Sequence, residues 1–296
     1  MNLDAGQFVL FAIGGLATAA YLFIVSAGLS LVFGALRVIN MAHGSLYMIA
    51  AFVTVVVANQ LGSVFGFWVA MLAAVVITGL VGAVIEVIVL RRVYRAEHLV
   101  QLLGTYAVTL IVAGAVRIIF SANYRTMKQP ELFSFTVHLG RFSYSAYTFF
   151  MIAAAVVIAI GVYALMYRTA LGRNIRAAVS DPELLNASGI DVPRLFTTVF
   201  AIGAGLAALG GVIVAPSQAV NPSMDTDVLV LAFAISVIGG LGSIVGSVVG
   251  SLIVGEVISF GLNNKYTNGF ALAFVFLIMA GVLIVRPWGL FGKPES

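Results

Sequence analysis

The sequence contains no cysteine and very little charge. Only 9% of its 296 residues are Asp, Glu, Lys or Arg, whereas an average soluble domain has about a quarter. The absence of cysteine excludes a disulfide framework, a thiolate metal site and a cysteine nucleophile. The shortage of charge excludes an ordinary soluble surface. Hydrophobic residues, at 62%, take its place and indicate an integral membrane protein.

Several chemical motifs are also missing. None of the three lysines, Lys128, Lys265 and Lys293, follows a GxxxxGK(S/T) frame, so we expect no nucleotide hydrolysis by the chain itself. HExxH, GxSxG and clustered His/carboxylate patterns are absent, which argues against a membrane protease or metalloenzyme. The apolar runs lack the central acidic or basic residues common in proton-coupled carriers. We therefore expect a non-enzyme with no cofactor and no metal of its own.

Long uncharged runs predict membrane-spanning helices, each of which needs about 20 apolar residues. No segment shows the apolar/polar alternation of a strand, and the N-terminus lacks the basic stretch of a cleaved signal peptide. We predict one all-α, polytopic transmembrane domain over residues 1–296. It has eight or nine crossings, near residues 8–35, 42–58, 66–90, 99–119, 145–166, 195–215, 228–238 with 244–260, and 268–285.

Two of these runs do not fit a simple straight crossing. Residues 8–36 exceed one perpendicular span, and Gly28, Ser30 and Gly34 allow a bend or a tilt. Residues 228–260 either cross twice, with a half-length first segment, or dip in and return. In both cases the backbone near Gly239 must be shielded by protein or line a water-filled path, because lipid cannot satisfy its peptide groups.

Basic residues are divided unequally between the two sides of this layout. The basic residues lie at the ends of apolar runs. Their positions, and the net charge of +4 that they produce, therefore indicate membrane topology rather than nucleic-acid binding. The richer side is expected to be cytoplasmic, which places the N-terminus outside and the C-terminus inside. Ten lie on that side (Arg37, Arg91, Arg92, Arg95, Arg168, Arg173, Arg176, Arg194, Arg286 and Lys293) and four on the other (Arg125, Lys128, Arg141 and Lys265).

Residues 168–194, RTALGRNIRAAVSDPELLNASGIDVPR, form the one long polar segment on the basic side. A first short helix is predicted from Gly172 to Ser180. Asp181 is predicted to cap a second short helix, which begins at Pro182 and ends before Gly189. Glu183 lies in the first turn of this second helix. The segment has an apolar face (Ile175, Val179, Leu184 and Leu185) and two cations for charged contacts (Arg173 and Arg176). We predict that it binds a partner.

Small and polar residues single out further positions. Gly242, Gly246 and Gly250 recur every four residues and allow close helix packing, either within the bundle or against a second subunit or a moving surface. Asn40 and His43 lie at a turn between the first two spans. They either orient polar groups toward a substrate or gate, or are satisfied interfacial residues.

Acidic residues mark three more places. Glu86 and Glu256 lie within apolar runs, where an ionisable group is usually paired, protonated or facing a pathway. Glu256 and Arg117 both lie toward the outer ends of their spans, so an ion pair between them is a candidate. The outer segment 215–227 carries prolines and two acids. It is either a rigid rim that receives a delivering protein or a simple loop.

Five sequence blocks, in one order and spread over nearly the whole chain, resemble the permease subunits of branched-chain amino-acid ABC importers. They are GLSLVFGALRVINMAHGSLYMIAAF, LGRNIRAAVSDPELLNASGIDVPR, GAGLAALGGVIVAP, GGLGSIVGSVVG and VRPWGLFG. The resemblance implies a prokaryotic cytoplasmic-membrane (inner-membrane) protein, surrounded by lipid, that carries Leu, Ile or Val. Urea, short amides and other amino acids are the alternative cargoes.

The resemblance also implies partners. These are a second permease subunit, expected to be a different chain, two cytoplasmic ATPases that bind ATP and Mg, and an external solute-binding protein. A stand-alone secondary transporter would instead depend on an ion gradient. A membrane enzyme or a structural scaffold, the third alternative, would need a catalytic cluster that is absent.

Site residues follow from the same resemblance. The inner loop of such importers carries a coupling helix that docks on the ATPase, and segment 168–194 corresponds to it. The wider importer pattern has Glu-Ala-Ala where this chain has Arg176-Ala177-Ala178, which leaves the complementary charge of the ATPase open. The matching coupling positions are Gly172, Arg173, Arg176, Ala177, Asp181, Pro182, Glu183 and Gly189. Candidates for the path or gate are Asn40, His43, Gly239, Gly240 and Gly242.

Overall fold

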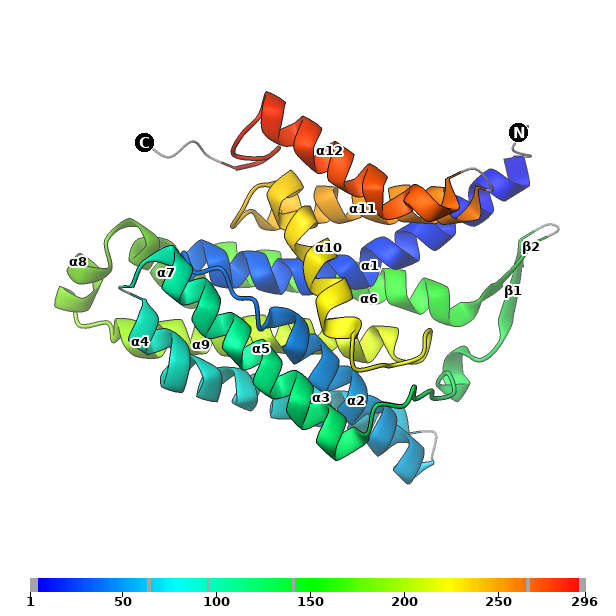
Figure 1. Ribbon diagram of the computed structural model, residues 1–296, viewed down its shortest axis with the longest axis horizontal. Helices are drawn as coiled ribbons and strands as arrows, with labels where there is room; N and C mark the ends of the chain where they lie inside the picture. The colour runs from blue at the N-terminus through cyan, green and yellow to red at the C-terminus, as the bar shows by residue number, and fades with distance from the viewer. Residues whose placement is uncertain (1–4, 63–64, 95, 140–141, 265–266, 293–296) are drawn as a thin grey trace.

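The computed structural model describes residues 5–62, 65–94, 96–139, 142–264 and 267–292, and most of this chain is helical (Figure 1). Within these residues, eight helices are long and apolar enough to cross a membrane. Large apolar side chains remain exposed along several of them, for example Ile111, Ile118 and Ile284. An apolar exterior of this kind is suited to lipid. The all-α, polytopic bundle predicted from the sequence is confirmed.

The helices follow the predicted order, with ends that differ by a few residues. In chain order the elements are α1 (Ala5–Leu36), α2 (His43–Leu61), α3 (Gly66–Ile85), a π-helical turn (Glu86–Leu90), α4 (Arg91–Val93), α5 (His98–Phe120), a 3-10 turn (Glu131–Phe133), β1 (Thr136–Leu139), β2 (Phe142–Ser145), α6 (Ala146–Arg168), α7 (Ala170–Ser180), α8 (Pro182–Ala187), α9 (Val192–Val214), α10 (Met224–Gly239), α11 (Ile244–Asn263), a second 3-10 turn (Asn268–Phe270) and α12 (Ala271–Val285).

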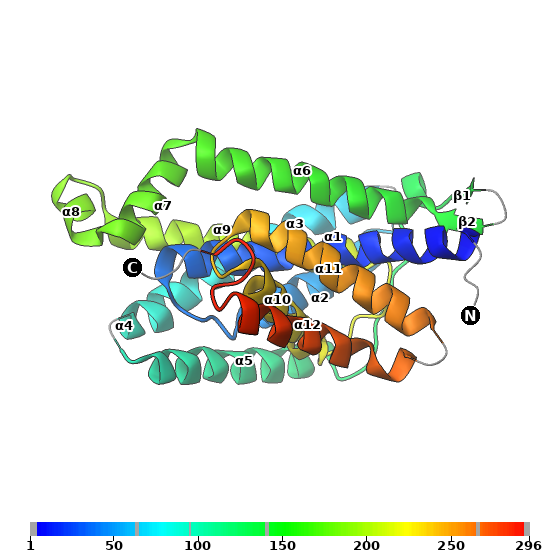
Figure 2. The same ribbon diagram turned by 90° about the horizontal axis from the view of Figure 1, so that it is seen from above.

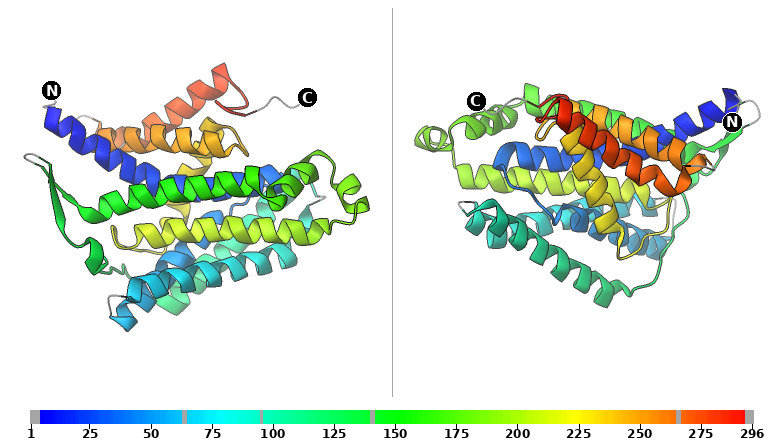
Figure 3. Two further views of the ribbon diagram at one scale, coloured as in Figure 1. Left: turned by 180° about the vertical axis from the view of Figure 1, so that it is seen from behind. Right: turned by 45° about the horizontal axis from the view of Figure 1, so that its top comes forward.

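Helix α1 is the centre of the bundle. Every residue from 22 to 32 is buried, and a helix that is buried on all sides belongs in a core. It packs against α6, α9, α10 and α11. Figure 3 shows α6 and α9 running alongside each other, and Figure 2 shows α6 and α5 on opposite sides of the bundle. Helices α2 and α3 pack on α9, and α12 covers α10 and α11.

Glycines set the closest helix contacts. A Cβ on Gly28 of α1 would lie 2.7 Å from the carbonyl oxygen of Gly203 in α9. A Cβ on Gly246 of α11 would lie 2.2 Å from the carbonyl oxygen of Gly239 in α10. Gly250 lies against Ile235 of α10 in the same way. The small-residue stripe of α11 therefore lies against α10 of the same chain, and the contacts support the packing role predicted for it.

Helix α1 runs without a break from Ala5 to Leu36. Gly28, Ser30 and Gly34 do not interrupt the helix, and these small residues are used for close packing and side-chain hydrogen bonds. Ser30, for example, shares a hydrogen bond of 2.7 Å with Ser247 of α11.

Helix α10 lies across the bundle and leads into α11, which runs along it (Figure 1). Helix α10 starts at Met224, four residues before the expected start, and has 16 residues. The turn that joins it to α11 packs on Gly34, near the last turn of α1. The turn therefore lies near the end of α1 rather than near its middle.

The sheet was not expected. Strands β1 and β2 pair antiparallel, with Thr136 opposite Ser145 and Val137 opposite Tyr144. The prediction of no strand anywhere is therefore wrong. Each strand has only four residues and lies between two apolar runs, so backbone pairing defines the hairpin and no long alternating pattern announces it. It projects at the end of the bundle that holds the N-terminus (Figure 2).

The glycine contact between α10 and α11 can be tested by substitution. We expect Gly246→Val to destabilise the purified protein by about 1–3 kcal/mol or more, because the added atoms overlap the backbone of Gly239. Gly281→Val in α12 is the matched control, since no atom lies within 4 Å of its added Cβ. Thermal unfolding in detergent measures both. Equal unfolding temperatures for the two variants would contradict the packing assignment.

Candidate functional site

The polar segment 168–194 folds into two capped helices at one end of the bundle, which we call the coupling end. The Thr169 hydroxyl accepts a hydrogen bond from the N–H of Gly172 (3.2 Å), and Asp181 Oδ1 accepts one from the N–H of Leu184 (2.9 Å). Gly189 follows α8 with φ of +87°, a conformation that favours glycine. The predicted second helix is confirmed. The first begins at Ala170 rather than Gly172, because Thr169 supplies its cap.

The apolar face of this segment points mainly into its own bundle. Ile175 and Leu185 are buried, and α7 packs on α6, α1 and α9. Gly172 is buried as well, and a Cβ there would lie 2.1 Å from the carbonyl oxygen of Met166. The expectation that Ile175 and Leu185 face a partner is therefore wrong: the periodicity marks an apolar face but not what covers it. Leu184, at 66% exposure, remains outside.

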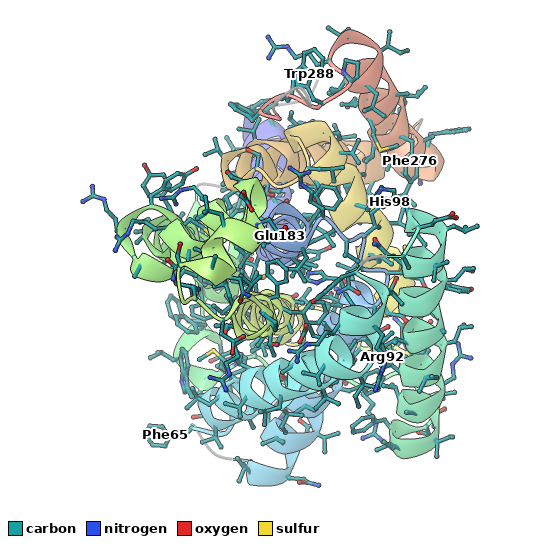
Figure 4. The ribbon with its side chains drawn as sticks, turned by 90° about the vertical axis from the view of Figure 1, so that its left-hand side faces the viewer. Phe65, Arg92, His98, Glu183, Phe276 and Trp288 are labelled. Carbon is teal, nitrogen blue, oxygen red and sulfur yellow. The ribbon has the colours of Figure 1, made fainter. Side chains whose placement is uncertain are left out.

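The exposed surface of the coupling segment is mixed apolar and charged. It includes Arg173, Arg176, Ala177, Asp181, Pro182, Glu183, Leu184 and Gly189. Arg176 is held by its own bundle, because its guanidinium donates to the carbonyl of Met166 and lies 5.4 Å from the ring centroid of Tyr167. Arg173 and Glu183 have no side-chain partner among the described residues. Figure 4 views this end directly, with Glu183, Arg92 and His98 labelled.

A cavity of about 390 Å³ lies between α7 and the ends of α1 and α11. Arg176 and Ser180 line it from α7, and Gly242 and Ser243 line it from the turn before α11. Helix α7 therefore meets α6 and α1 in tight contact but faces α11 across open space.

The chain enters α2 from inside the bundle. After α1 ends, residues 37–42 are non-helical and return toward its middle, so that His43 Nε2 donates to the carbonyl oxygen of Val25 (2.9 Å). Val25 lies eleven residues before Leu36, which places the start of α2 roughly 16 Å inside the end of α1. Two backbone N–H groups in this non-helical stretch donate hydrogen bonds to side chains. The N–H of Met41 donates to the Thr105 hydroxyl, and the N–H of Ala42 donates to Asn40 Oδ1.

The first turns of α2 and α10 meet at this depth. A Cβ on Gly44 would lie 2.1 Å from the carbonyl oxygen of Asp225, so only glycine fits there. The buried carboxylate of Asp225 accepts a hydrogen bond from the N–H of Thr226 (2.8 Å) and a longer one from Ser45 (3.5 Å). We call this meeting point, formed by Asn40, His43, Ser45 and Asp225, the helix-start junction.

Two polar atoms at the helix-start junction have no partner. Asn40 Nδ2 and His43 Nδ1 are buried and make no hydrogen bond among the described residues. Buried polar atoms are nearly always hydrogen bonded, so each exception calls for an explanation, such as an enclosed water molecule or a functional role. The two residues predicted for the path or gate are therefore in the interior, beside interrupted helices.

The glycines of the turn 239–243 have a different environment. Gly240 and Gly242 have positive φ values of +102° and +82°. The C-terminal segment covers this turn: Leu290 and Phe291 donate backbone hydrogen bonds of 2.9 Å to the carbonyls of Ile238 and Gly239. The backbone near Gly239 is shielded by protein, as the sequence requires of a break in a membrane helix. Gly242 also lines the cavity beside α7.

Glu86 forms a buried polar network that connects α3 to α9. Its carboxylate accepts hydrogen bonds from Thr197 (2.6 Å), Tyr94 (2.8 Å) and Arg91 (3.2 Å), and Arg91 also donates to Thr197 (2.6 Å). Burial and the nearby Glu86 raise the pKa of the Tyr94 phenol, which keeps it protonated as a donor. The sequence analysis left three roles open for Glu86: paired, protonated or facing a pathway. The structure shows that it is paired with Arg91. The nearby Arg91 was the only partner visible in the sequence.

Glu256 and Arg117 do not pair. Glu256 lies in α11 over Gly15 of α1, and its Oε2 has no hydrogen-bond partner. Arg117 is exposed in α5, which packs on α2 and not on α11. The candidate ion pair is therefore wrong, because similar depth in a membrane does not place two helices side by side. Four basic residues of the charge count, Arg95, Arg141, Lys265 and Lys293, lie outside the described residues.

These features define a class of protein: a multi-pass helical membrane protein with interrupted helices in its interior and a capped helical pair at one end. Within the described residues, no group of His, Cys, Asp or Glu side chains is placed to hold a metal ion. The chain belongs to the family of branched-chain amino acid transport system permease components, whose model matches residues 11–285. It is thus a transport permease, in agreement with the resemblance seen in the sequence.

Individual relatives match over almost the whole chain. The high-affinity branched-chain amino acid transport system permease protein BraD of Pseudomonas aeruginosa is 27% identical, over 96% of this chain and 95% of its own. The corresponding protein LivH of Escherichia coli is 29% identical, over 92% and 91%. A probable branched-chain amino acid transport permease of Methanocaldococcus jannaschii is 25% identical, over 94% and 91%. No solved structure gives a significant match.

The two acidic residues inside apolar runs are predicted to respond in opposite ways to truncation. Glu86→Ala removes the acceptor of three donors and should destabilise the protein by about 2 kcal/mol, the cost of losing hydrogen bonds to a buried charged group. Glu256→Ala removes an unpartnered carboxyl and should be neutral or stabilising. Thermal unfolding in detergent compares them. A Glu86→Ala protein as stable as the parent would show that the network contributes nothing.

Proposed function

We propose that this chain forms half of the translocation path of an ATP-driven importer for branched-chain amino acids. Its segment 168–194 docks on a cytoplasmic ATPase that binds ATP and Mg. A second permease subunit, a second ATPase and an external solute-binding protein complete the assembly. The cargo is supported by the names of the relatives, which are permease proteins of branched-chain amino acid transport systems. The chain itself performs no catalysis, and energy enters through the coupling segment.

The observation that carries the proposal is the capped pair α7–α8. It projects beyond the ends of the other helices (Figure 2), yet it is anchored by buried Ile175 and Leu185. Its outer surface keeps Leu184 exposed and leaves Arg173 and Glu183 without partners in the described chain. A rigid element with a mixed apolar and charged outer surface is suited to docking, and its preformed caps lower the ordering cost of binding.

Closure of the ATPases would then move α7 together with α6 and α1, on which it packs. The helix-start junction is the proposed gate, because Asn40 and His43 hold unsatisfied polar atoms beside two helix starts. Interrupted helices of this kind line substrate paths in other membrane transporters. The switch between inward-open and outward-open forms is then driven by the differential affinity of the ATPases for the two states.

The proposal requires that the coupling end face the cytoplasm and the N-terminus lie outside. The cysteine-free chain allows a direct test with single cysteines at two exposed serines, Ser188→Cys at the coupling end and Ser134→Cys at the other. In intact cells lacking the partner ATPases, an impermeant thiol reagent applied outside should label Ser134→Cys and spare Ser188→Cys. Permeabilised cells should show both labelled. The reverse pattern in intact cells would overturn the orientation.

Docking through Leu184 is tested by a charge placed at an exposed leucine. Leu184→Glu should lower co-purification of the ATPase and abolish substrate-stimulated ATP hydrolysis and uptake, because it buries a charge in the contact. Folding should be little changed, since the side chain is 66% exposed. Leu132→Glu is the matched control, at 62% exposure and at the opposite end. Normal coupling in Leu184→Glu would exclude this residue from the docking surface.

A further inference from the structure

A small polar cavity lies one turn along α2 from the helix-start junction. It has a volume of about 120 Å³ and lies between the middle of α1, the first turns of α2 and α10, and the loop that joins α9 to α10. Its lining combines two phenols, two amides, one carboxylate and three larger apolar side chains with Ala219. The residues are Tyr21, Tyr47, Gln218, Ala219, Asn221, Met224, Asp227, Val228 and Leu231.

Asp227 supplies the one carboxylate of the lining. Asp227 is exposed and forms no ion pair and no side-chain hydrogen bond with another described residue. It differs in this from Asp225, two residues earlier, which is buried and hydrogen bonded. An unpaired carboxylate beside two aromatic rings attracts an ammonium group, through its charge and through the faces of the rings.

The remaining polar groups of the lining are neutral and able to donate. Tyr21 and Tyr47 carry hydroxyls, and Gln218 and Asn221 carry amide N–H groups. Gln218 is hydrogen bonded to the Tyr47 hydroxyl, and an amide NH₂ has a second N–H for a carboxylate. Met224, Val228 and Leu231 form an apolar wall from successive turns of α10. One anion, several neutral donors and an apolar wall match the three parts of a zwitterionic aliphatic amino acid: its ammonium, its carboxylate and its side chain.

The size of the cavity indicates which part of the molecule it holds. At about 120 Å³ it is several times larger than the ~10–15 Å³ that a single water molecule needs. It therefore has room for the ammonium and carboxylate of an amino acid. The aliphatic side chain would extend along the exposed face of α10, where Val230 is 41% exposed.

We propose that this cavity binds the zwitterionic head group of the transported amino acid, with Asp227 recognising the ammonium. The inference rests on the proposed function and adds to it a substrate contact. Asp227 also lies in the first turn of α10, where an acid stabilises a helix through the dipole alone. The test must therefore distinguish binding from helix stability.

Protection of a single cysteine provides the test. Ala219→Cys, in the assembled importer with the full-length chain, places the one thiol of this subunit in the cavity lining. At a leucine concentration about ten times Kd, labelling should slow about tenfold, because only unoccupied sites react. Isoamylamine lacks the carboxylate and 4-methylpentanoate lacks the ammonium, so neither should protect at that concentration. Ser134→Cys, outside the cavity, should label at an unchanged rate with leucine.

The role of Asp227 is read from a second substitution. Asp227→Asn in the Ala219→Cys background should raise the leucine concentration needed for half-maximal protection about tenfold. This is the loss of affinity expected for one charge-assisted hydrogen bond. Glu131→Gln, an exposed acid outside the cavity, should leave it unchanged. Unchanged protection in Asp227→Asn, with or without a lower unfolding temperature, would overturn the proposed contact.

Uptake into proteoliposomes separates this inference from the proposed function. If the assembled importer takes up leucine but leucine does not protect Ala219→Cys, the head-group site is wrong while the transport function holds. If leucine is not transported but another zwitterionic amino acid is transported and protects the thiol, the cavity is retained and the cargo must be revised.

Discussion

Inside a membrane every peptide group must be hydrogen bonded by protein or by enclosed water, and this constraint governs where the helices of this chain can stop. Two non-helical stretches, residues 37–42 and 240–243, lie against buried parts of the bundle. In the first, Thr105 and Asn40 accept the free backbone N–H groups. Beside the second, the C-terminal segment donates to the last carbonyls of α10. Each interruption therefore depends on residues far away in the sequence.

The span layout was predictable because a single property, the length of an uncharged run, decides whether a segment can cross a membrane. The caps of the coupling segment were predictable for a similar reason, since Asp181 and Gly189 act on residues within one turn. Contacts between distant residues were not. Thr197 reaches Glu86 across 111 positions, and nothing local marks Thr197 as a partner. The hairpin β1–β2 was missed because four-residue strands carry almost no periodic signal.

The coupling segment shows why periodicity predicts a face but not its neighbour. Ile175 and Leu185 have the spacing of an apolar docking surface, and the structure uses them to anchor α7 and α8 to the bundle. What remains for a partner is a smaller patch around Leu184, with charges on either side. With this division, the buried side of the helix pair would transmit movement to α6 and α1, on which α7 packs. The exposed side would bind and release a partner without unfolding the pair.

Movement at the coupling end has a direct route to the cavity that contains Asp227. Helix α1 contacts α7 near its end and lines the cavity with Tyr21 near its middle, and it has no break over its 32 residues, roughly 48 Å. The contact of Gly28 with Gly203 leaves no room for α1 to slide independently of α9. The Glu86–Thr197 hydrogen bond in turn fastens α9 to the end of α3. We therefore expect α1, α9 and α3 to move as one body together with α2, which packs on α3 and α9, so that α10, whose first turn meets α2 beside α1, is the element whose displacement opens or closes the path.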